Sequence, residues 1–486
     1  MKAKKLSQTL ALMFLVSACH ITGTCKVGNN DDCQGGAVCV GGKEAEIGDD
    51  GVCAYVSLES VASMPAISGF SPLEARFGEE LSIFGNNFSM DVGENVVKLN
   101  GVEAVVVKVE VGKLSVVVPK NKSCSGLVQV TVENQTATST AAFTYVPTAV
   151  VSTLAGSGPT GSSSGGYAEG GGNVARFNQP LGITIDKEGN LYVADSYNHS
   201  IRKVRPDGVV SMFAGSGTMG FNDGTANAAQ FAYLADIVIG AAGNLYVADT
   251  HNHRIRKVTP DRVVSTLVGS GPVGSNNGGY VDGGANTAQF NRPFGIETDT
   301  EGNLYVSDHY NHRIRKVTPD RVVSTLSGSG PTGAELGGYV DGAKDSAQFY
   351  RPRGLSIDAE GNLYVADYGN HRIRKVTQQG EASTVAGKGS TGSADGTRTS
   401  AEFRYPSKVI ADAAGNFYVT DSQNNRIRKL TPEGGVSTLV GSTDGYADGT
   451  GDEVHFSHPW GIAIDKEGNL YVTDTYNHRI RKIVLE

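Results

Sequence analysis

Several features are scarce or absent in this sequence of 486 residues, and each absence narrows its function. Basic residues do not outnumber acidic ones: 42 Lys and Arg against 50 Asp and Glu give a formal net charge of −8. Because nucleic-acid-binding surfaces are basic, this balance gives no reason to expect a nucleic-acid partner. No long apolar run occurs beyond the N-terminal region, so we expect any membrane attachment to depend on an anchor. The cysteines form no CxxC pair, which disfavours a zinc knuckle.

The N-terminal region is typical of an export signal. Three lysines precede the apolar run LALMFLVSA, which is too short to span a bilayer in the mature protein. The run ends in LVSAC, which resembles a bacterial lipobox and implies a signal peptide over residues 1–18 and lipidation of Cys19. A plain secretory signal or an uncleaved anchor is the alternative. Since His20 and not Asp follows the cysteine, we expect sorting to the outer membrane or cell surface if the organism has two membranes.

Residues 19–60 are predicted to form a lipid-anchored, cysteine-rich stalk. The cysteines of this segment, besides the lipidated one, are Cys25, Cys33, Cys39 and Cys53. In an exported chain they indicate two disulfides, and the sequence leaves all three connectivities open. The sixth cysteine, Cys124, is then either a free thiol or the partner in an intermolecular disulfide.

Residues 64–146 alternate between apolar and polar positions in short runs such as VVKLNGVEAVVV and GLVQVTVEN. Period-two alternation broken by Gly, Pro and Asn about every ten residues indicates an antiparallel β-sandwich. The residues Pro72, Gly78, Gly85, Asn87, Phe88, Pro119 and Gly126 resemble the pattern of the IPT/TIG immunoglobulin-like domains. This resemblance implies a spacer or binding module without catalytic activity.

Residues 147–486 contain six copies of one unit, and the 64 glycines of the chain fit its many tight turns. The sequence GNLYVAD or a close variant begins at Gly189, Gly243, Gly302, Gly361, Gly415 and Gly468. Each unit contains four short strands, which predicts a six-bladed β-propeller. The sixth unit lacks its fourth strand, and the segment TAVVSTLAG, residues 148–156, is expected to supply it and close the ring. The predicted fold is therefore all-β, a sandwich followed by a propeller closed by an N-terminal outer strand.

Every unit also carries the motif Asp-x-x-Asn-(His)-x-Ile, from Asp195 to Ile480, with His replaced once by Asn425. This motif is similar to that of the NHL repeats, a propeller family. Some cytoplasmic NHL propellers bind RNA, but the export signal and the net acidity argue against RNA here.

The repeated polar residues are interpreted as architecture. The histidines of the motif are His199, His253, His312, His371 and His478. In a six-fold ring their turn lies roughly 15 Å from the axis, too far apart for one zinc ion, so we expect no metal site. The Asp and Asn of the turn are expected to bond their own backbone in Asx-turns. The RIRK cations are expected to lie along the outer wall with their charged heads in water.

The variable positions lie where loops converge on the channel mouth. Each long loop between units enters the innermost strand through Phe-x-x-Pro, and the residues flanking that proline differ between units. The candidate ligand-binding residues are Tyr233, Arg292, Phe294, Arg351, Arg353, Tyr405, His458 and Trp460. Aromatic and cationic residues suit a carbohydrate, an anionic sugar or a peptide carboxylate, through stacking and bidentate Arg contacts. The alternative is that they plug the channel and vary by drift.

These observations predict an exported, surface-anchored binding protein that recognises a glycan or a protein or peptide ligand without turnover and without a cofactor. One alternative is a hydrolase or lyase of the type found among six-bladed lactonases and amidating lyases, which hold a metal in the channel. Glu297 and His458 are the residues that such chemistry would use here, and one of each makes neither a metal site nor a convincing acid–base pair. The other alternative is a structural scaffold for protein assembly.

Overall fold

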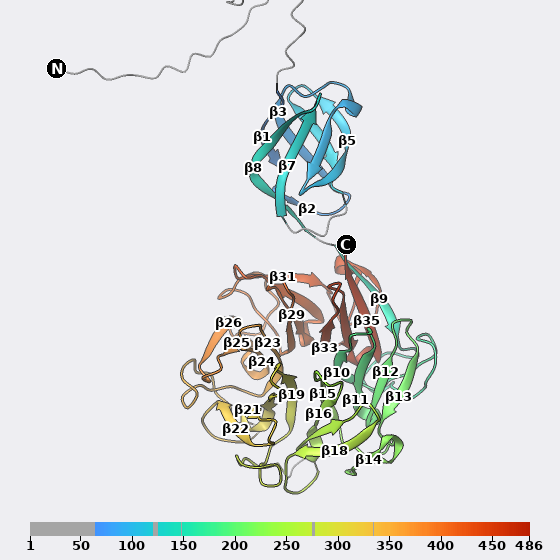
Figure 1. Cartoon of the computed structure of the whole chain (residues 1–486), viewed down its shortest axis with the longest axis vertical. Coiled ribbons are helices and arrows are strands. Elements are labelled where there is room, and N and C mark those ends of the chain that lie inside the picture. The colour runs from blue at the N-terminus through green and yellow to red at the C-terminus, as the bar shows by residue number, and fades with distance from the viewer. Residues whose placement is uncertain (1–63, 120–124, 147, 275–277, 334) are drawn as a thin grey trace, which may run out of the picture.

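The computed structural model is all-β, and it confirms the predicted sandwich and six-bladed propeller (Figure 1). The structure describes residues 64–119, 125–146, 148–274, 278–333 and 335–486. The predicted signal peptide, the stalk and all six cysteines lie outside these ranges, so the disulfides and the lipidation of Cys19 stay predictions. Within the described ranges, no helix has the length and apolar character needed to cross a membrane.

The N-terminal domain is a sandwich of eight strands with the hydrogen-bonding order β1-β3-β6-β5-β4-β7-β8-β2. The strands are β1 (Ala66–Ser71), β2 (Glu74–Ala75), β3 (Glu80–Asn86), β4 (Val96–Leu99), β5 (Val102–Glu110), β6 (Lys113–Val117), β7 (Ser125–Val132) and β8 (Gln135–Tyr145). The alternation seen in the sequence determines the core: in β5, Ala104 and Val106 are buried whereas Val105 and Val107 are exposed.

Each propeller blade is an antiparallel sheet, and its strands are arranged in order from the central channel to the outer wall. Blades one to three comprise β10 (Pro180–Ile185), β11 (Leu191–Asp195), β12 (Ser200–Val204), β13 (Val210–Ala214); β15 (Leu234–Ile239), β16 (Leu245–Asp249), β17 (Arg254–Val258), β18 (Val263–Val268); and β19 (Pro293–Thr298), β20 (Leu304–Asp308), β21 (Arg313–Val317), β22 (Val323–Ser327). Blades four to six comprise β23 (Pro352–Ile357), β24 (Leu363–Asp367), β25 (Arg372–Val376), β26 (Ala382–Ala386); β28 (Pro406–Ala411), β29 (Phe417–Asp421), β30 (Arg426–Leu430), β31 (Gly435–Val440); and β33 (Pro459–Ile464), β34 (Leu470–Asp474), β35 (Arg479–Leu485), β9 (Ala149–Ala155). The two-residue strands β14 (Gly224–Thr225), β27 (Gly396–Thr397) and β32 (Gly449–Thr450) extend three of the outer edges.

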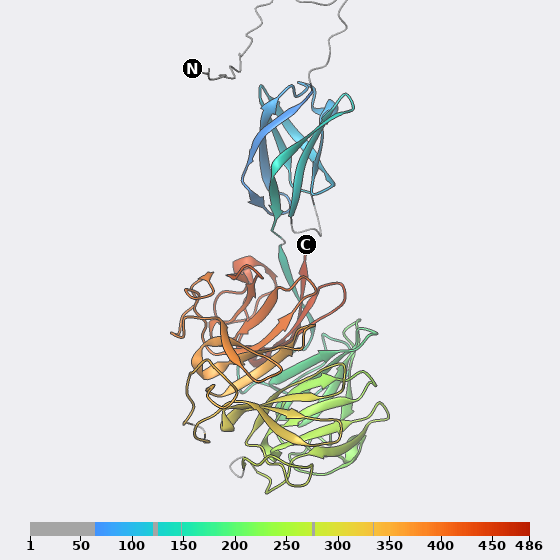
Figure 2. The ribbon, with the colours of Figure 1, turned by 60° about the vertical axis from the view of Figure 1, so that its left-hand side comes forward.

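The outer strand of the sixth blade comes from the opposite end of the propeller sequence. Strand β9 pairs antiparallel with β35, with Val151 opposite Ile483. Beyond these strands, the backbones of Thr148 and Glu486 exchange hydrogen bonds of 2.8 and 2.9 Å. Figure 2 shows the chain passing from the sandwich into this strand beside the C-terminus.

Hydrophobic clusters between neighbouring blades form the core. The Phe of each Phe-x-x-Pro segment is fully buried: Phe177, Phe231, Phe290, Phe349, Phe403 and Phe456. Near the channel the innermost strands approach one another closely, and a Cβ on Gly295 would lie 2.3 Å from the carbonyl oxygen of Arg353. Glycine is therefore required at this position, and it recurs in four of the six innermost strands.

Candidate functional site

A buried ion pair fixes the turn between the second and third strands of every blade. In the third blade, one oxygen of Asp308 accepts from the Asn291 backbone N–H at 2.8 Å, and the other accepts from Asn311 Nδ2 at 2.8 Å and from Arg315 Nη1 at 2.6 Å. Asp308 and Arg315 are both fully buried. The same Asp–Arg pair occurs in all six blades.

Two expectations about this motif were wrong. The Asp carboxylate does not accept from the backbone of its own turn: besides the side chains of Asn311 and Arg315, it accepts from the loop that precedes the innermost strand, because the buried turn folds back onto that loop. The second Arg of each RIRK sequence does not extend into water, since Arg202, Arg256, Arg315, Arg374, Arg428 and Arg481 are 0% exposed. Burial is possible because each guanidinium is paired with a carboxylate and donates to backbone carbonyls.

The motif histidine joins one blade to the next. His312 has a left-handed backbone (φ 57°), and its Nδ1 accepts a hydrogen bond of 3.0 Å from the backbone N–H of Arg351 in the fourth blade. Its Nε2 donates to the Gly333 carbonyl at 2.6 Å, so the ring is neutral, and burial lowers its pKa. In the fifth blade, Asn425 Oδ1 replaces the imidazole and accepts from the His458 N–H at 2.9 Å. These contacts agree with the interpretation of the histidines as architecture.

These inter-blade bonds set the conformation of the mouth. The residue before each Pro or Leu of the innermost strand has φ between 50° and 56°, an uncommon conformation for a residue other than glycine. These residues are Gln179, Tyr233, Arg292, Arg351, Tyr405 and His458. Because their backbones are held in one conformation, the sequence can vary their side chains without moving the loop.

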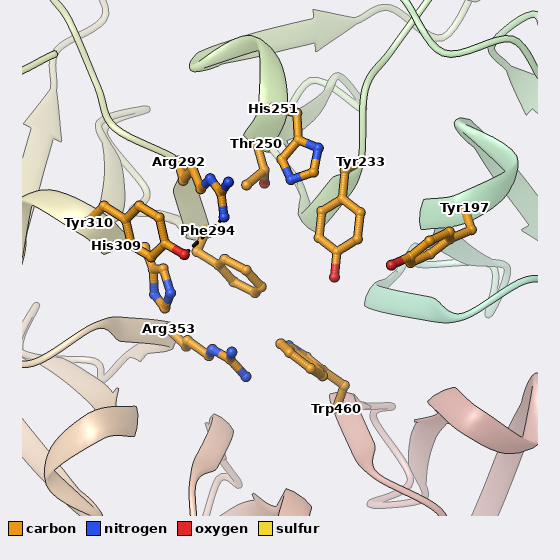
Figure 3. A pocket seen from close by; sticks show the side chains of 10 residues that line it. All are labelled: Tyr197, Tyr233, Thr250, His251, Arg292, Phe294, His309, Tyr310, Arg353 and Trp460. Carbon is orange, nitrogen blue, oxygen red and sulfur yellow. Dashed lines mark hydrogen bonds between the residues drawn. The ribbon is translucent and has the colours of Figure 1, made fainter. Parts of the chain in front are cut away.

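A pocket of about 230 Å³ opens at the mouth (Figure 3). Its lining residues are Tyr197, Tyr233, Thr250, His251, Arg292, Phe294, His309, Tyr310, Arg353 and Trp460. Five of the eight predicted binding residues are among them: Tyr233, Arg292, Phe294, Arg353 and Trp460. The side chains come from blades one, two, three, four and six and point toward a common space.

The three other predicted residues do not line this pocket. Arg351 forms an ion pair with Glu335 of the preceding loop. Tyr405 packs edge-on against His371, with ring centroids 4.5 Å apart. The ring of His458 lies 4.4 Å from that of Tyr476.

Half of the lining was not predicted. Tyr197, Thr250, His251, His309 and Tyr310 occupy the two variable positions of the Asp-x-x-Asn turn. The first of these positions is Ser or Thr in four blades, where the hydroxyl donates to the innermost strand of the next blade, as Thr250 does to the Pro293 carbonyl at 2.8 Å. The replacement of Ser or Thr by His309 in blade three was the sequence signal that this position contributes to the pocket.

Arg353 is the most unusual charge in the pocket. Its guanidinium carbon lies 3.2 Å from the ring centroid of Tyr368, 4.1 Å from that of Trp460 and 5.0 Å from that of Phe294. Its polar contacts are a weak hydrogen bond of 3.5 Å to Ser407 Oγ and a hydrogen bond to the Tyr368 side chain. Within the described residues it has no ion-pair partner, and burial lowers its pKa.

Blades two and three contribute a second guanidinium and two neutral histidines to the pocket. Arg292 Nη1 donates to the Tyr310 hydroxyl at 2.9 Å. His251 stacks on Tyr233 with centroids 4.7 Å apart, and burial together with the charge of Arg292 lowers its pKa to about 4. Burial lowers the pKa of His309 well below its usual value. At neutral pH the charges lining the pocket are therefore the two guanidiniums, since no carboxylate is among its ten lining residues.

An ion pair crosses the channel one residue deeper along the innermost strands. Asp236 and Lys408 replace the recurrent glycine in blades two and five, which face each other in a ring of six. Lys408 Nζ lies 2.5 Å from Asp236 Oδ2, and both residues are buried. Glu297 interacts with this pair, and burial raises its pKa to about 7.

The acid–base alternative gains no geometric support. The interactions of Glu297 are with the cross-channel pair, whereas His458 contacts Asn425 and Tyr476 at the rim. The structure does not bring Glu297 and His458 together. Across the described ranges, no group of three or more His, Cys, Asp or Glu side chains is arranged to hold a metal ion.

Comparison with known families agrees with both domain assignments. The IPT/TIG domain matches residues 65–145, and the NHL repeat matches residues 177–204, 231–258, 290–317, 349–376 and 456–483. The fifth blade, in which Asn425 replaces His, lies outside these matched segments.

Similar proteins match this chain over part of their length. The chain is 30% identical over 326 residues to Protein SUPPRESSOR OF QUENCHING 1, chloroplastic, from Arabidopsis thaliana, which covers 63% of this chain and 30% of that protein. It is 29% identical over 346 residues to NHL repeat-containing protein 2 from Homo sapiens, covering 63% of this chain and 46% of that protein. The chain thus spans less than half of the length of these relatives.

Solved structures match both domains together. An auxiliary nutrient binding protein from Bacteroides thetaiotaomicron has a TM-score of 0.54 and 21% identity, covering 87% of this chain and 98% of that one. Another auxiliary nutrient binding protein, from Bacteroides ovatus, has a TM-score of 0.53 and 21% identity over the same shares. At this level of identity the likeness concerns the fold.

Proposed function

We propose that this chain is an exported, envelope-anchored binding protein that captures a glycan or peptide ligand in the pocket at the propeller mouth, without turnover. The observation that carries the proposal is the position of Arg353: a guanidinium with no ion-pair partner among the described residues, packed between aromatic rings, at a position that holds a different residue in each of the six units. Aromatic walls with a few convergent polar groups are the usual composition of a ligand site.

The sandwich-plus-propeller arrangement supports a binding role as well. The two Bacteroides structures with this arrangement are described as auxiliary nutrient binding proteins, and they match 87% of the chain. In the proposal, the lipidated Cys19 and the stalk hold the sandwich, which presents the propeller to solutes.

Binding without turnover is preferred to catalysis because of the composition of the pocket. A hydrolase or lyase needs an acid–base pair or a metal within reach of the ligand. The candidate bases are His251 and His309, and no lining carboxylate stands opposite them. If this interpretation is correct, a captured ligand is recovered chemically unchanged.

The test is a combined glycan and peptide array probed with the full chain, a Trp460→Ala variant and an outer-wall control, Lys316→Ala. We expect binding that Trp460→Ala loses and Lys316→Ala keeps, with the eluted ligand intact by mass spectrometry. Equal binding by all three proteins would overturn the mouth as the site. A cleaved ligand would overturn binding without turnover, and association lost only in the outer-wall control would favour the scaffold alternative.

A further inference from the structure

We infer that the pocket binds the acidic terminal residue of a glycan, a single sugar ring that carries one carboxylate or sulfate. This inference rests on the proposed function and narrows its ligand. It follows from the charge of the pocket, from the shape of its aromatic walls and from its hydroxyl groups.

The charge of Arg353 favours an anionic ligand. Six guanidiniums of the propeller, one in each blade, are fully buried, and each is paired with an Asp carboxylate. Three further arginines, Arg254, Arg313 and Arg479, are 7–8% exposed, and each donates to two backbone carbonyls. Among the described residues Arg353 has neither kind of partner, because three rings and the hydroxyl oxygen of Ser407 surround it. An uncompensated cation in such surroundings is costly, and an oxyanion of the ligand would supply the missing charge through charge-assisted hydrogen bonds.

The rest of the lining disfavours a neutral sugar. Neutral sugars are commonly held by carboxylate or amide side chains that accept from hydroxyl groups, and none of the ten lining residues is Asp, Glu, Asn or Gln. The lining carries a second guanidinium, Arg292, from blade three, which neighbours the blade of Arg353 (Figure 3). Since His251 and His309 are neutral, the charged side chains among the ten lining residues are these two arginines.

The aromatic walls suit one flat ring. Phe294 and Trp460 stack with centroids 5.5 Å apart and an interplanar angle of 22°, and Arg353 lies beside both. The volume of about 230 Å³ is smaller than the sites of drug-sized ligands, about 300–1,000 Å³, so it takes a single ring and not a longer chain.

The hydroxyl groups favour a sugar over a peptide end. Tyr197, Tyr233 and Tyr310 each bring a hydroxyl to the pocket wall. A hydroxylated ring can exchange hydrogen bonds with several of them, whereas an apolar amino-acid side chain would desolvate them without replacement.

The single tryptophan of the chain makes this inference directly measurable. Trp460 is the only Trp of the 486 residues and lies in the pocket, so its fluorescence reports occupancy of this site. The full chain is titrated with oligosaccharides ending in glucuronate, in the 6-sulfate of glucose or in glucose, at constant ionic strength. We expect a saturable fluorescence change with an acidic terminus and about tenfold or weaker affinity for the neutral counterpart. The two acidic arms distinguish carboxylate from sulfate.

Matched variants test whether Arg353 supplies the charge that binds the acidic sugar. Arg353→Met should lose about tenfold or more in affinity for the acidic sugar, whereas Arg351→Met, two residues away and paired with Glu335, should stay within about twofold. Equal affinity for neutral and acidic termini, or unchanged affinity in Arg353→Met, would overturn the acidic-sugar inference while leaving the mouth as a binding site. A flat titration with every sugar overturns it too. The proposed function fails separately, through the array and the Trp460→Ala variant.

Discussion

Arg353 gives a prediction whose sign separates a binding residue from a structural plug. If the guanidinium is retained for a ligand, its partial burial without a carboxylate among the described residues lowers the stability of the ligand-free protein. Replacement by Met removes the charge and keeps a flexible apolar side chain between the same rings. We therefore expect Arg353→Met to leave the free energy of unfolding unchanged or to raise it, although the same variant loses the ligand.

The magnitude follows from two opposing contributions. Desolvation of an ion costs several kcal/mol in a protein, after relaxation. Contacts with aromatic faces return about 0.5–2 kcal/mol each, and Arg353 has three such faces, at 3.2, 4.1 and 5.0 Å. The two contributions nearly cancel, and Met regains part of the ring contacts. The expected change lies between zero and a stabilisation of about 2 kcal/mol.

The measurement is urea unfolding of the full chain followed by circular dichroism, because the substitution itself perturbs the fluorescence of Trp460. Thermal unfolding gives a second measure, and a protein of this size shifts by about 2–4 °C per kcal/mol. If Arg353→Met lowers the free energy of unfolding by more than about 2 kcal/mol, the guanidinium serves packing and the reasoning is refuted.

Three further predictions concern the frame. Arg315→Met leaves a buried carboxylate without its cation and should cost about 3–5 kcal/mol, whereas Lys316→Met, on the outer face of the same strand, should cost under about 0.5 kcal/mol in the same urea assay. His312→Ala loses both inter-blade hydrogen bonds and should cost about 2–4 kcal/mol, whereas His312→Asn should cost clearly less, since Asn serves this role in blade five. Burial lowers the pKa of His312 in the folded chain, so below pH 6.5 the unfolded chain binds a proton at this residue that the folded chain does not bind. The free energy of unfolding should therefore fall as the pH decreases through 6.5. The fall should be less steep in His312→Asn. Lys408→Met should cost about 3–5 kcal/mol and the double variant with Asp236→Ala clearly less; equal losses would contradict a coupled ion pair across the channel.

The repeat made much of the fold predictable. A motif found six times with a missing last strand determines the blade number, and Phe-x-x-Pro marks the start of each innermost strand. Differences among repeats pointed to the mouth, and five of eight candidates line the pocket, including Arg353 and Trp460. Comparison of the six units separates positions that the fold requires, which are the same in most units, from positions that are free to change.

The remaining features depend on contacts that the sequence does not display. The order of strands placed the RIRK arginines near the outer wall, but only the folded turn brings Asp308 within 2.6 Å of Arg315 and makes a buried pair. His309 was overlooked because its motif repeats and was interpreted as architecture as a whole. The two middle positions of this motif differ between the units, as do the residues around the proline.

The two replacements of the recurrent glycine bear on the pocket itself. In a ring of six, blade n faces blade n + 3, so an Asp in blade two and a Lys in blade five can meet across the axis, as Asp236 and Lys408 do at 2.5 Å. Each follows by one residue a position that flanks the mouth, Ala235 and Ser407, so the pair lies one residue deeper along the innermost strands than these positions. Because Asp236 and Lys408 neutralise each other, the pair fills the channel there without neutralising the charge of Arg353. Because a site shielded from water strengthens electrostatic attraction, this closure favours a strong hold on an anion that enters from the mouth.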